Sequence, residues 1–174
     1  AANKRFVFGY EEALGYTVGP LVRDKDGISA ALLFAELWAL RRSAGKTMQD
    51  ELEAISRTYG LFVSGQVSVT MKGSDGLAQI QQCMARLRGQ TIDKVGPLAV
   101  LATSDVKVGT RTATGGTESK LTLPPSDVLI YELEGQSRII ARPSGTEPKI
   151  KFYFDVCEQV REGDGGVQVD HRSA

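Results

Sequence analysis

The stretch RIIARPSGTEPKIKFYFDV, residues 138–156, decides how the second half of this chain folds. It places two runs rich in β-branched and aromatic residues, 138–141 and 150–156, on either side of the segment Arg142–Lys149. Such runs predict β-strands. The segment between them contains two prolines and one glycine, so we expect a stiff loop that presents backbone N–H groups.

This loop has the side chains of an anion site. The charged residues of 138–151 are Arg138, Arg142, Lys149, Lys151 and Glu147, a net charge of +3. The Arg142 guanidinium can bind two phosphate oxygens at once. Ser144 and Thr146 add hydroxyl donors, and Gly145 lets the main chain approach an anion closely. The alternative is a hairpin-like turn closed by a surface ion pair between Arg142 and Glu147.

The composition indicates a folded protein without a global preference for polyanions. The 174 residues are 41% hydrophobic and 24% charged, with 21 positive and 21 negative side chains. This balance gives no argument for binding to nucleic acid or to an anionic membrane surface. Cys83 and Cys157 form no CxxC or Cys/His set, so we expect no zinc site and two reduced, half-buried thiols, as in a cytoplasmic protein. The apolar run 28–40 is too short to span a bilayer.

Hydrophobic periodicity predicts the other elements. We expect helices at about 28–43, 47–59 and 74–88, the first buried on most sides because eleven of the residues 28–40 are apolar. Further strands are expected at 4–8, 61–71, 98–102 and 128–133, with a mobile, Gly/Thr-rich loop at 109–120. The order predicts an α+β fold whose small sheet is mostly antiparallel, with a domain boundary near residue 60.

Two further loops carry candidate side chains. The loop Gly9–Tyr16, GYEEALGY, contains Glu11 and Glu12, and a carboxylate can accept hydrogen bonds from two neighbouring sugar hydroxyls. The alternative is a solvent-exposed acidic loop without a binding role. The turn Arg23–Gly27, RDKDG, places Lys25 between two aspartates. There the alternative is an exposed lysine beside an aspartate that caps the following helix.

Both regions resemble one enzyme family. RPSGTEPKIKFY resembles the phosphate-binding loop in the last domain of the α-D-phosphohexomutases, the phosphoglucomutases and phosphomannomutases, and GYEEALGY resembles the sugar-specificity loop of their third domain. The resemblance implies that the phosphate that is not transferred is bound by Arg142, Ser144, Gly145 and Thr146, with help from Lys149. It also implies that Glu11 binds the sugar O3 and O4 and that Lys25 assists proton transfer or stabilises charge near the reacting oxygens.

The resemblance also implies a domain arrangement. Residues 1–59 would be the end of the α/β third domain, 60–160 the last domain, and 161–174 a polar tail. Ala13 stands where the family often has a serine, so one hydroxyl contact is missing. That pattern is associated with members that act on glucose and related sugar or pentose phosphates.

The implied activity belongs to a larger enzyme. Family members move phosphate between O1 and O6 of a sugar through a phosphoserine and a bisphosphate intermediate, with Mg²⁺ held by an Asp-x-Asp-x-Asp loop and a glucose 1,6-bisphosphate-type activator. Neither motif occurs in this sequence, and its one histidine is His171. The partners would be a phosphosugar and the N-terminal domains of a cytoplasmic enzyme, and this chain alone would be inactive. The alternatives are a stand-alone sugar-phosphate-binding module and a structural α+β interaction domain.

Overall fold

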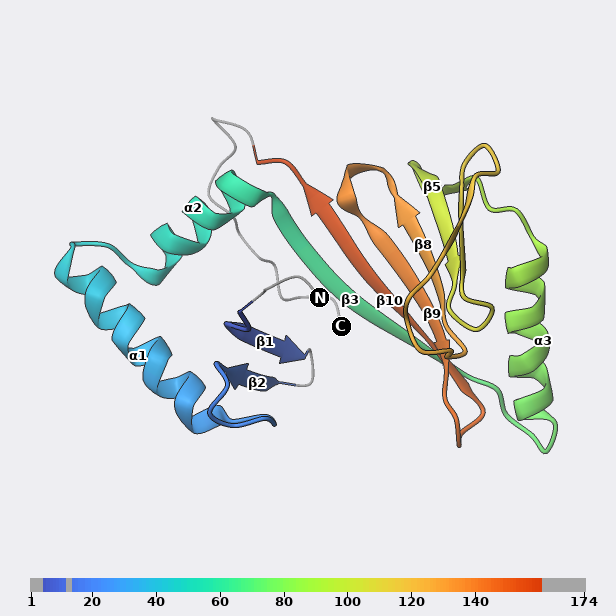
Figure 1. The fold of residues 1–174 in the computed structure, drawn as a ribbon, viewed down its shortest axis with the longest axis horizontal. Helices are drawn as coiled ribbons and strands as arrows, with labels where there is room; N and C mark the ends of the chain where they lie inside the picture. Colours follow the sequence, from blue (N-terminus) through green and yellow to red (C-terminus); the bar gives the residue numbers. More distant parts are fainter. Residues whose placement is uncertain (1–4, 12–13, 161–174) are drawn as a thin grey trace. The chain divides into compact units, whose positions relative to one another are not determined.

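The computed structural model describes residues 5–11 and 14–160 (Figure 1). The described residues divide into two compact units, one within residues 1–55 and the other within residues 56–164. The expectations about Glu12, Ala13, His171 and the tail 161–174 lie outside the described residues.

The first unit begins with a β-hairpin. Strands β1 (Phe8–Glu11) and β2 (Gly15–Val18) pair antiparallel, with Tyr10 opposite Tyr16. The prediction of a strand ending at residue 8 and a loop over 9–16 is therefore wrong. The aromatic side chains explain the hairpin, because the ring of Phe8 lies 6.4 Å from that of Tyr10 and 6.2 Å from that of Tyr16, contacts that stabilise paired strands.

Two helices follow, and both begin at predicted caps. Helix α1 spans Gly27–Ser43, and the Asp26 carboxylate accepts hydrogen bonds from the N–H groups of Ile28 and Ser29. Helix α2 spans Met48–Tyr59. The Thr47 N–H donates to the Asp50 carboxylate at 2.7 Å, and the Asp50 N–H donates to the Thr47 hydroxyl at 3.1 Å. This is the expected capping box with aspartate in place of glutamate.

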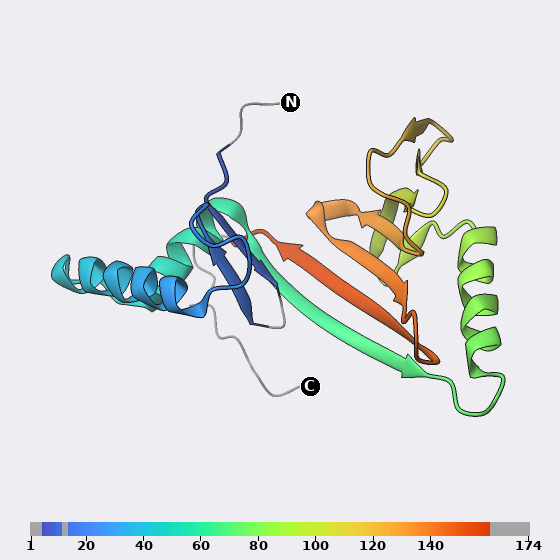
Figure 2. The same cartoon turned by 60° about the horizontal axis from the view of Figure 1, so that its bottom comes forward.

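The expected burial of α1 is wrong. It packs against β2 at one end (Figure 2), and none of its residues is buried. Ile28 and Leu32 are 85% and 71% exposed. The prediction counted apolar side chains, but burial also needs neighbouring elements that cover them. In this unit α1 has little more than one hairpin to pack against. In the part of the chain that the structure describes, no helix is long and apolar enough to cross a membrane.

The second unit is built around an antiparallel sheet. Its strands are β3 (Leu61–Thr70), β4 (Lys94–Val95), β5 (Leu98–Asp105), β6 (Thr110–Ala113), β7 (Glu118–Lys120), β8 (Leu129–Leu133), β9 (Arg138–Pro143) and β10 (Lys149–Glu158). The order is β3-β10-β9-β8-β5-β6-β7, and β4 pairs with β5. The predicted strands are confirmed, and the predicted turn between β8 and β9 contains Gly135 at a φ of 70°.

Helix α3 (Gly76–Gly89) lies against one face of this sheet (Figure 1). Its Ile80 and Met84 are almost completely buried and pack with Leu129 and Ile150, each such side chain contributing roughly 1.5–3 kcal/mol. The predicted apolar face is correct except at its first position, since Leu77 is 53% exposed.

The mobile loop expected at 109–120 is wrong. These residues form the hairpin β6–β7, in which Thr112 lies opposite Glu118. Gly115 and Gly116 make the connecting turn at φ values of 99° and 84°, a conformation that glycine adopts without strain. The polar composition gave no strand signal because this hairpin extends the edge of the sheet at β5 and does not cover a hydrophobic core.

Candidate functional site

Two cations face each other at the end of the sheet that carries the 142–149 loop. Arg142 on β9 and Lys151 on β10 are cross-strand partners, so their side chains leave the same face of the sheet. Across residues 5–11 and 14–160, neither side chain has a hydrogen bond or an ion pair. Like charges directly opposite each other are destabilising unless they are neutralised. An anion bound between them would supply that neutralisation.

The alternative of an ion pair between Arg142 and Glu147 is wrong. Glu147 instead pairs with Lys149, and the two side chains are 2.5 Å apart. The hydrogen bond from Lys149, and then the charges of Lys149 and Lys151, lower the pKa of Glu147, so it is ionised at neutral pH. Its carboxylate forms an ion pair with the Lys149 ammonium, so it does not neutralise Arg142, whose guanidinium remains available to an anion.

Hydrogen bonds within the loop fix its shape. The Ser144 N–H donates to the Lys149 carbonyl at 2.8 Å. The Ser144 hydroxyl oxygen accepts from the N–H groups of Thr146 at 3.5 Å and Glu147 at 3.2 Å. A Cβ on Gly145 would meet no atom within 4 Å. The protein itself therefore leaves open space in front of Gly145, where a ligand can approach the main chain.

The base of the loop is anchored to α3. The Met71 N–H donates to the Pro148 carbonyl at 2.8 Å. Gly76, the first residue of α3, is buried, and a Cβ there would lie 2.7 Å from the Met71 carbonyl oxygen and 2.8 Å from the Pro148 Cβ. Only glycine allows this contact, so the loop base and the start of the helix are in direct contact.

In the first unit, the structure brings two predicted site residues together. The Lys25 Nζ lies 2.9 Å from a carboxylate oxygen of Glu11, and both side chains are at least half exposed. The hydrogen bond to Glu11 and its charge raise the pKa of Lys25. The ion pair leaves the second Glu11 oxygen and two Lys25 protons for a ligand.

The positions of these side chains are set by β2 and by the turn before α1. Gly15, the partner of Glu11, is buried, and a Cβ there would lie 2.5 Å from Lys25 Cδ and 2.7 Å from the Glu11 oxygen. The Asp24 carboxylate accepts from the Lys25 N–H at 2.7 Å, and the Asp26 N–H donates to the Tyr16 carbonyl at 2.6 Å. Asp26 caps the helix while Lys25 points to Glu11, so the capping alternative and the site prediction concern different residues.

Sequence reasoning missed Lys151 and Gly15 as members of these clusters. Lys151 was counted in the local charge, but only the register of β9 and β10 puts it opposite Arg142. Gly15 matters because the side chains of Glu11 and Lys25, four and ten positions away, come too close to it to allow a Cβ. The alternation of side chains along two strands joined by a short loop could have suggested that Arg142 and Lys151 share a face. No local sequence signal indicates the contacts of Gly15.

Family comparisons agree with both regions. The model described as phosphoglucomutase/phosphomannomutase, alpha/beta/alpha domain III, matches residues 1–59, and the model of the C-terminal domain of the same family matches residues 125–170. The chain belongs to the phosphoglucomutase/phosphomannomutase family. Members of this family are phosphohexomutases, which are isomerases acting in carbohydrate metabolism.

Relatives show which portion of the family is present. The chain is 45% identical over 151 residues to a probable phosphomannomutase of Haemophilus influenzae, a match of 86% of this chain and 28% of that protein. It is 40% identical over 166 residues to a phosphoglucomutase of Staphylococcus epidermidis, a match of 90% and 30%. The chain thus spans less than a third of the length of these relatives and corresponds to their C-terminal portion.

A solved structure supports the fold. The open form of the exocytosis-sensitive phosphoprotein parafusin, a phosphoglucomutase from Paramecium, superposes with a TM-score of 0.54 at 18% identity. The match covers 89% of this chain and 26% of that one. Together with the two family models, it confirms the expected class, an α+β last domain with a mostly antiparallel sheet preceded by a piece of the third domain.

Proposed function

We propose that the chain is the C-terminal part of a phosphohexomutase that interconverts sugar 1-phosphates and 6-phosphates through a phosphoserine and a bisphosphate intermediate. Its own part is to bind the sugar hydroxyls and the phosphate that is not being transferred. The observation that supports this most strongly is the cross-strand pair of Arg142 and Lys151, neither of which has an ion-pair partner among the described residues, beside a loop rich in donors.

The phosphate ligands would be Arg142, Ser144, Gly145 and Thr146. A guanidinium contributes two parallel hydrogen bonds to phosphate, and each charged hydrogen bond is worth roughly 1.5–3 kcal/mol. The open face of Gly145 suits the approach of an oxyanion to the backbone. Lys149 would assist after its ammonium turns from Glu147, and Lys151 adds a cation that faces Arg142.

The sugar contacts would come from the Glu11–Lys25 pair. A Glu11 oxygen can accept from the O3 or O4 hydroxyl. Because Glu11 raises the pKa of Lys25, the lysine holds its proton firmly at neutral pH. This favours a role as a hydrogen-bond donor that stabilises charge on reacting oxygens over a role as a base.

A distant phosphate clamp fits this chemistry. A bisphosphate intermediate must present first one phosphate and then the other to the reacting serine, and the idle phosphate then needs a fixed site. Phosphoryl transfer depends on positioning and charge stabilisation. In this proposal the 142–149 loop positions the sugar, while the phosphoserine is supplied by N-terminal domains of the same enzyme, so the chain alone is inactive.

The Mg²⁺ of the proposed enzyme does not fit the residues seen here. Among residues 5–11 and 14–160, no group of three or more His, Cys, Asp or Glu side chains could hold a metal ion. We therefore assign no metal ligand to this part of the chain. Mg²⁺ and the glucose 1,6-bisphosphate-type activator remain proposals for the complete enzyme. The unpaired, half-buried Cys83 and Cys157 fit the cytoplasm that we propose as its location.

Calorimetry of glucose 1,6-bisphosphate binding to this chain at low salt tests the proposal. We expect Arg142→Ala to abolish most of the binding and Lys151→Ala to weaken it about tenfold, the effect of roughly 1.4 kcal/mol. Arg138→Ala is a matched control, because Arg138 lies on the same strand and face but is paired with Asp155 at 2.6 Å. Equal binding by wild type and Arg142→Ala would remove the loop from the mechanism.

A further inference from the structure

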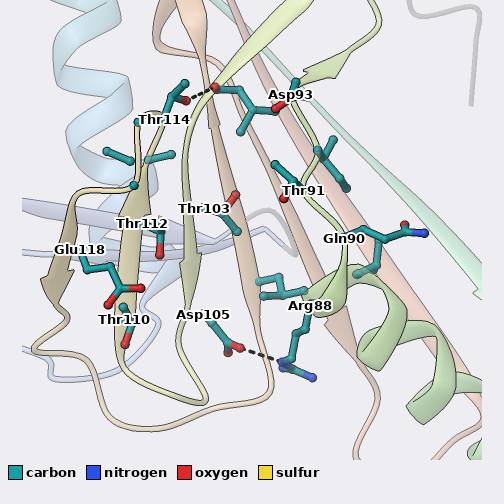
Figure 3. Close-up of a pocket in the computed structure, with 18 of the residues that line it drawn as sticks. Arg88, Gln90, Thr91, Asp93, Thr103, Asp105, Thr110, Thr112, Thr114 and Glu118 are labelled. Carbon is teal, nitrogen blue, oxygen red and sulfur yellow. Dashed lines mark hydrogen bonds and ion pairs between the residues drawn. The ribbon is translucent and has the colours of Figure 1, made fainter.

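A pocket opens in the unit that contains the sheet, and none of its lining residues belongs to the 142–149 loop. Its volume is about 660 Å³, within the range of about 300–1,000 Å³ usual for small-molecule sites. Figure 3 shows Thr110, Thr112 and Glu118 on one side, Gln90, Thr91 and Asp93 on the other, and Thr103 and Asp105 between them.

Strand register gathers polar groups along this pocket. Thr103 on β5 is the partner of Thr112 on β6, which in turn is the partner of Glu118 on β7. Three neighbouring strands thus present two hydroxyls and a carboxylate in one row on one face. The side chains of all three have no hydrogen-bond or ion-pair partner within the described ranges.

The wall that carries this row is held in place. The Thr114 N–H donates to the Leu101 carbonyl at 2.8 Å, and the Thr114 hydroxyl donates to the Val100 carbonyl at 2.6 Å. The Ala113 N–H donates to the Thr117 carbonyl at 2.9 Å and closes the turn. These bonds fix the hairpin against β5, so the hydroxyl row is already arranged before a ligand arrives.

Charge restricts the class of ligand. The lining contains a single cation, Arg88, and its guanidinium is occupied by Asp105 at 2.9 Å and by Asp127. Asp93 and Glu118 are exposed carboxylates without ion-pair partners among the residues described. The pocket therefore repels phosphate and other anions. No aromatic side chain lines it, so stacking of a base is not provided.

We propose that this pocket binds a neutral sugar unit without a phosphate group. Sugar hydroxyls would donate to the Glu118 and Asp93 carboxylates and exchange hydrogen bonds with the Thr103 and Thr112 hydroxyls. The apolar C–H groups of the ring would lie on the apolar part of the lining that is not buried, which includes Leu87, Ile92 and Val108. This is a carbohydrate site separate from the phosphosugar site of the proposed function.

The test is a titration of the ¹⁵N-labelled chain with glucose and with maltose, followed by backbone amide shifts. We expect shifts at Thr103, Thr112 and Glu118. Thr112→Val keeps a β-branched strand residue, and Glu118→Gln keeps the shape of the side chain, so both retain the hairpin. Each is expected to weaken binding about three- to tenfold. Thr122→Val, an exposed position outside the pocket, is the matched control and should bind as wild type does.

The proposal would be overturned by the absence of shifts at this row with either sugar, by shifts that map to residues 142–149, or by sugar binding that Thr112→Val and Glu118→Gln leave intact. Shifts at the row with the polyamine spermidine but not with glucose would also overturn it, because they would make the pocket a cation site. Arg142→Ala must retain the response to glucose, and this separates failure here from failure of the phosphate clamp.

Discussion

Gly15 and Lys25 are in such close contact that a methyl group on Gly15 would lie 2.5 Å from the Lys25 Cδ. We expect Gly15→Ala to displace Lys25 and break its ion pair with Glu11. The pKa of the Lys25 ammonium should then fall toward its ordinary value, because Glu11 is what raises it. NMR titration of the labelled lysine measures this directly.

Gly27→Ala is the control for that experiment, since a Cβ on Gly27 would meet no atom within 4 Å. It should leave the Lys25 titration unchanged. An unaltered Lys25 pKa in Gly15→Ala would show that the pair re-forms around the new methyl group and that Gly15 is not needed for it.

Glu147 is paired with Lys149 and in the proposed site would compete with the ligand for it, so removing the charge of Glu147 should strengthen phosphate binding. We expect Glu147→Gln to bind glucose 1,6-bisphosphate about two- to fivefold more tightly, within the range for exposed charge pairs. Calorimetry beside the Lys149→Met and double variants measures the coupling. Weaker binding by Glu147→Gln would instead mean that Glu147 holds Lys149 in its productive position.

Asp155 links three strands of the sheet, and its contribution should depend on pH. Its carboxylate accepts from the Ser64 hydroxyl and from Arg138 Nε, each at 2.6 Å. Burial opposes the charged form, but these two hydrogen bonds and the Arg138 charge outweigh it and lower the pKa of Asp155. The stabilisation is therefore present above the unfolded-state pKa of about 3.9 and is lost as pH falls through the lower folded-state pKa.

We expect Asp155→Asn to lower the free energy of opening of β9 and β10 by about 1–2 kcal/mol at neutral pH. The difference from wild type should shrink as the pH is lowered below about 4. Hydrogen exchange of the β9 and β10 amides measures the difference in stability at neutral pH, and urea unfolding measures it at acidic pH. Glu158→Gln, exposed at the end of the same strand, should change neither, and a difference that persists in acid would contradict the assignment.

Ile80 carries part of the contact between α3 and the sheet. Because its side chain is 1% exposed, Ile80→Ala should destabilise the second unit by about 2–5 kcal/mol through lost burial and a cavity. Leu77→Ala removes the same kind of side chain from the same helix at an exposed position and should cost under about 1 kcal/mol. Urea unfolding followed by hydrogen exchange in β8–β10 compares them.

The sequence predicts best where one local rule decides the structure. The capping box at Thr47 and Asp50, the strands around 142–149 and the apolar face at Ile80 and Met84 all follow from short spacings. The family resemblance likewise rests on contiguous motifs. These features need no knowledge of which strand lies beside which.

The failures share one physical cause, contacts between distant segments. Thr110–Ala113 becomes a strand because β5 offers it an edge, not because its composition favours one. The apolar side chains of α1 stay exposed because burial needs a second surface. Lys151 joins Arg142 only through strand register.

The contact between Gly76 and Pro148 joins the proposed phosphate-binding loop to the packing of α3. Side chains of that helix pack in the core with Leu129 and Ile150, and their anchoring sets where the base of the loop rests. Substitutions that loosen the helix from the sheet would therefore shift the loop and register as losses of ligand affinity. If variants were tested for ligand binding alone, core residues of α3 would then be counted among the residues of the proposed phosphate site, although they would act only through the position of the loop.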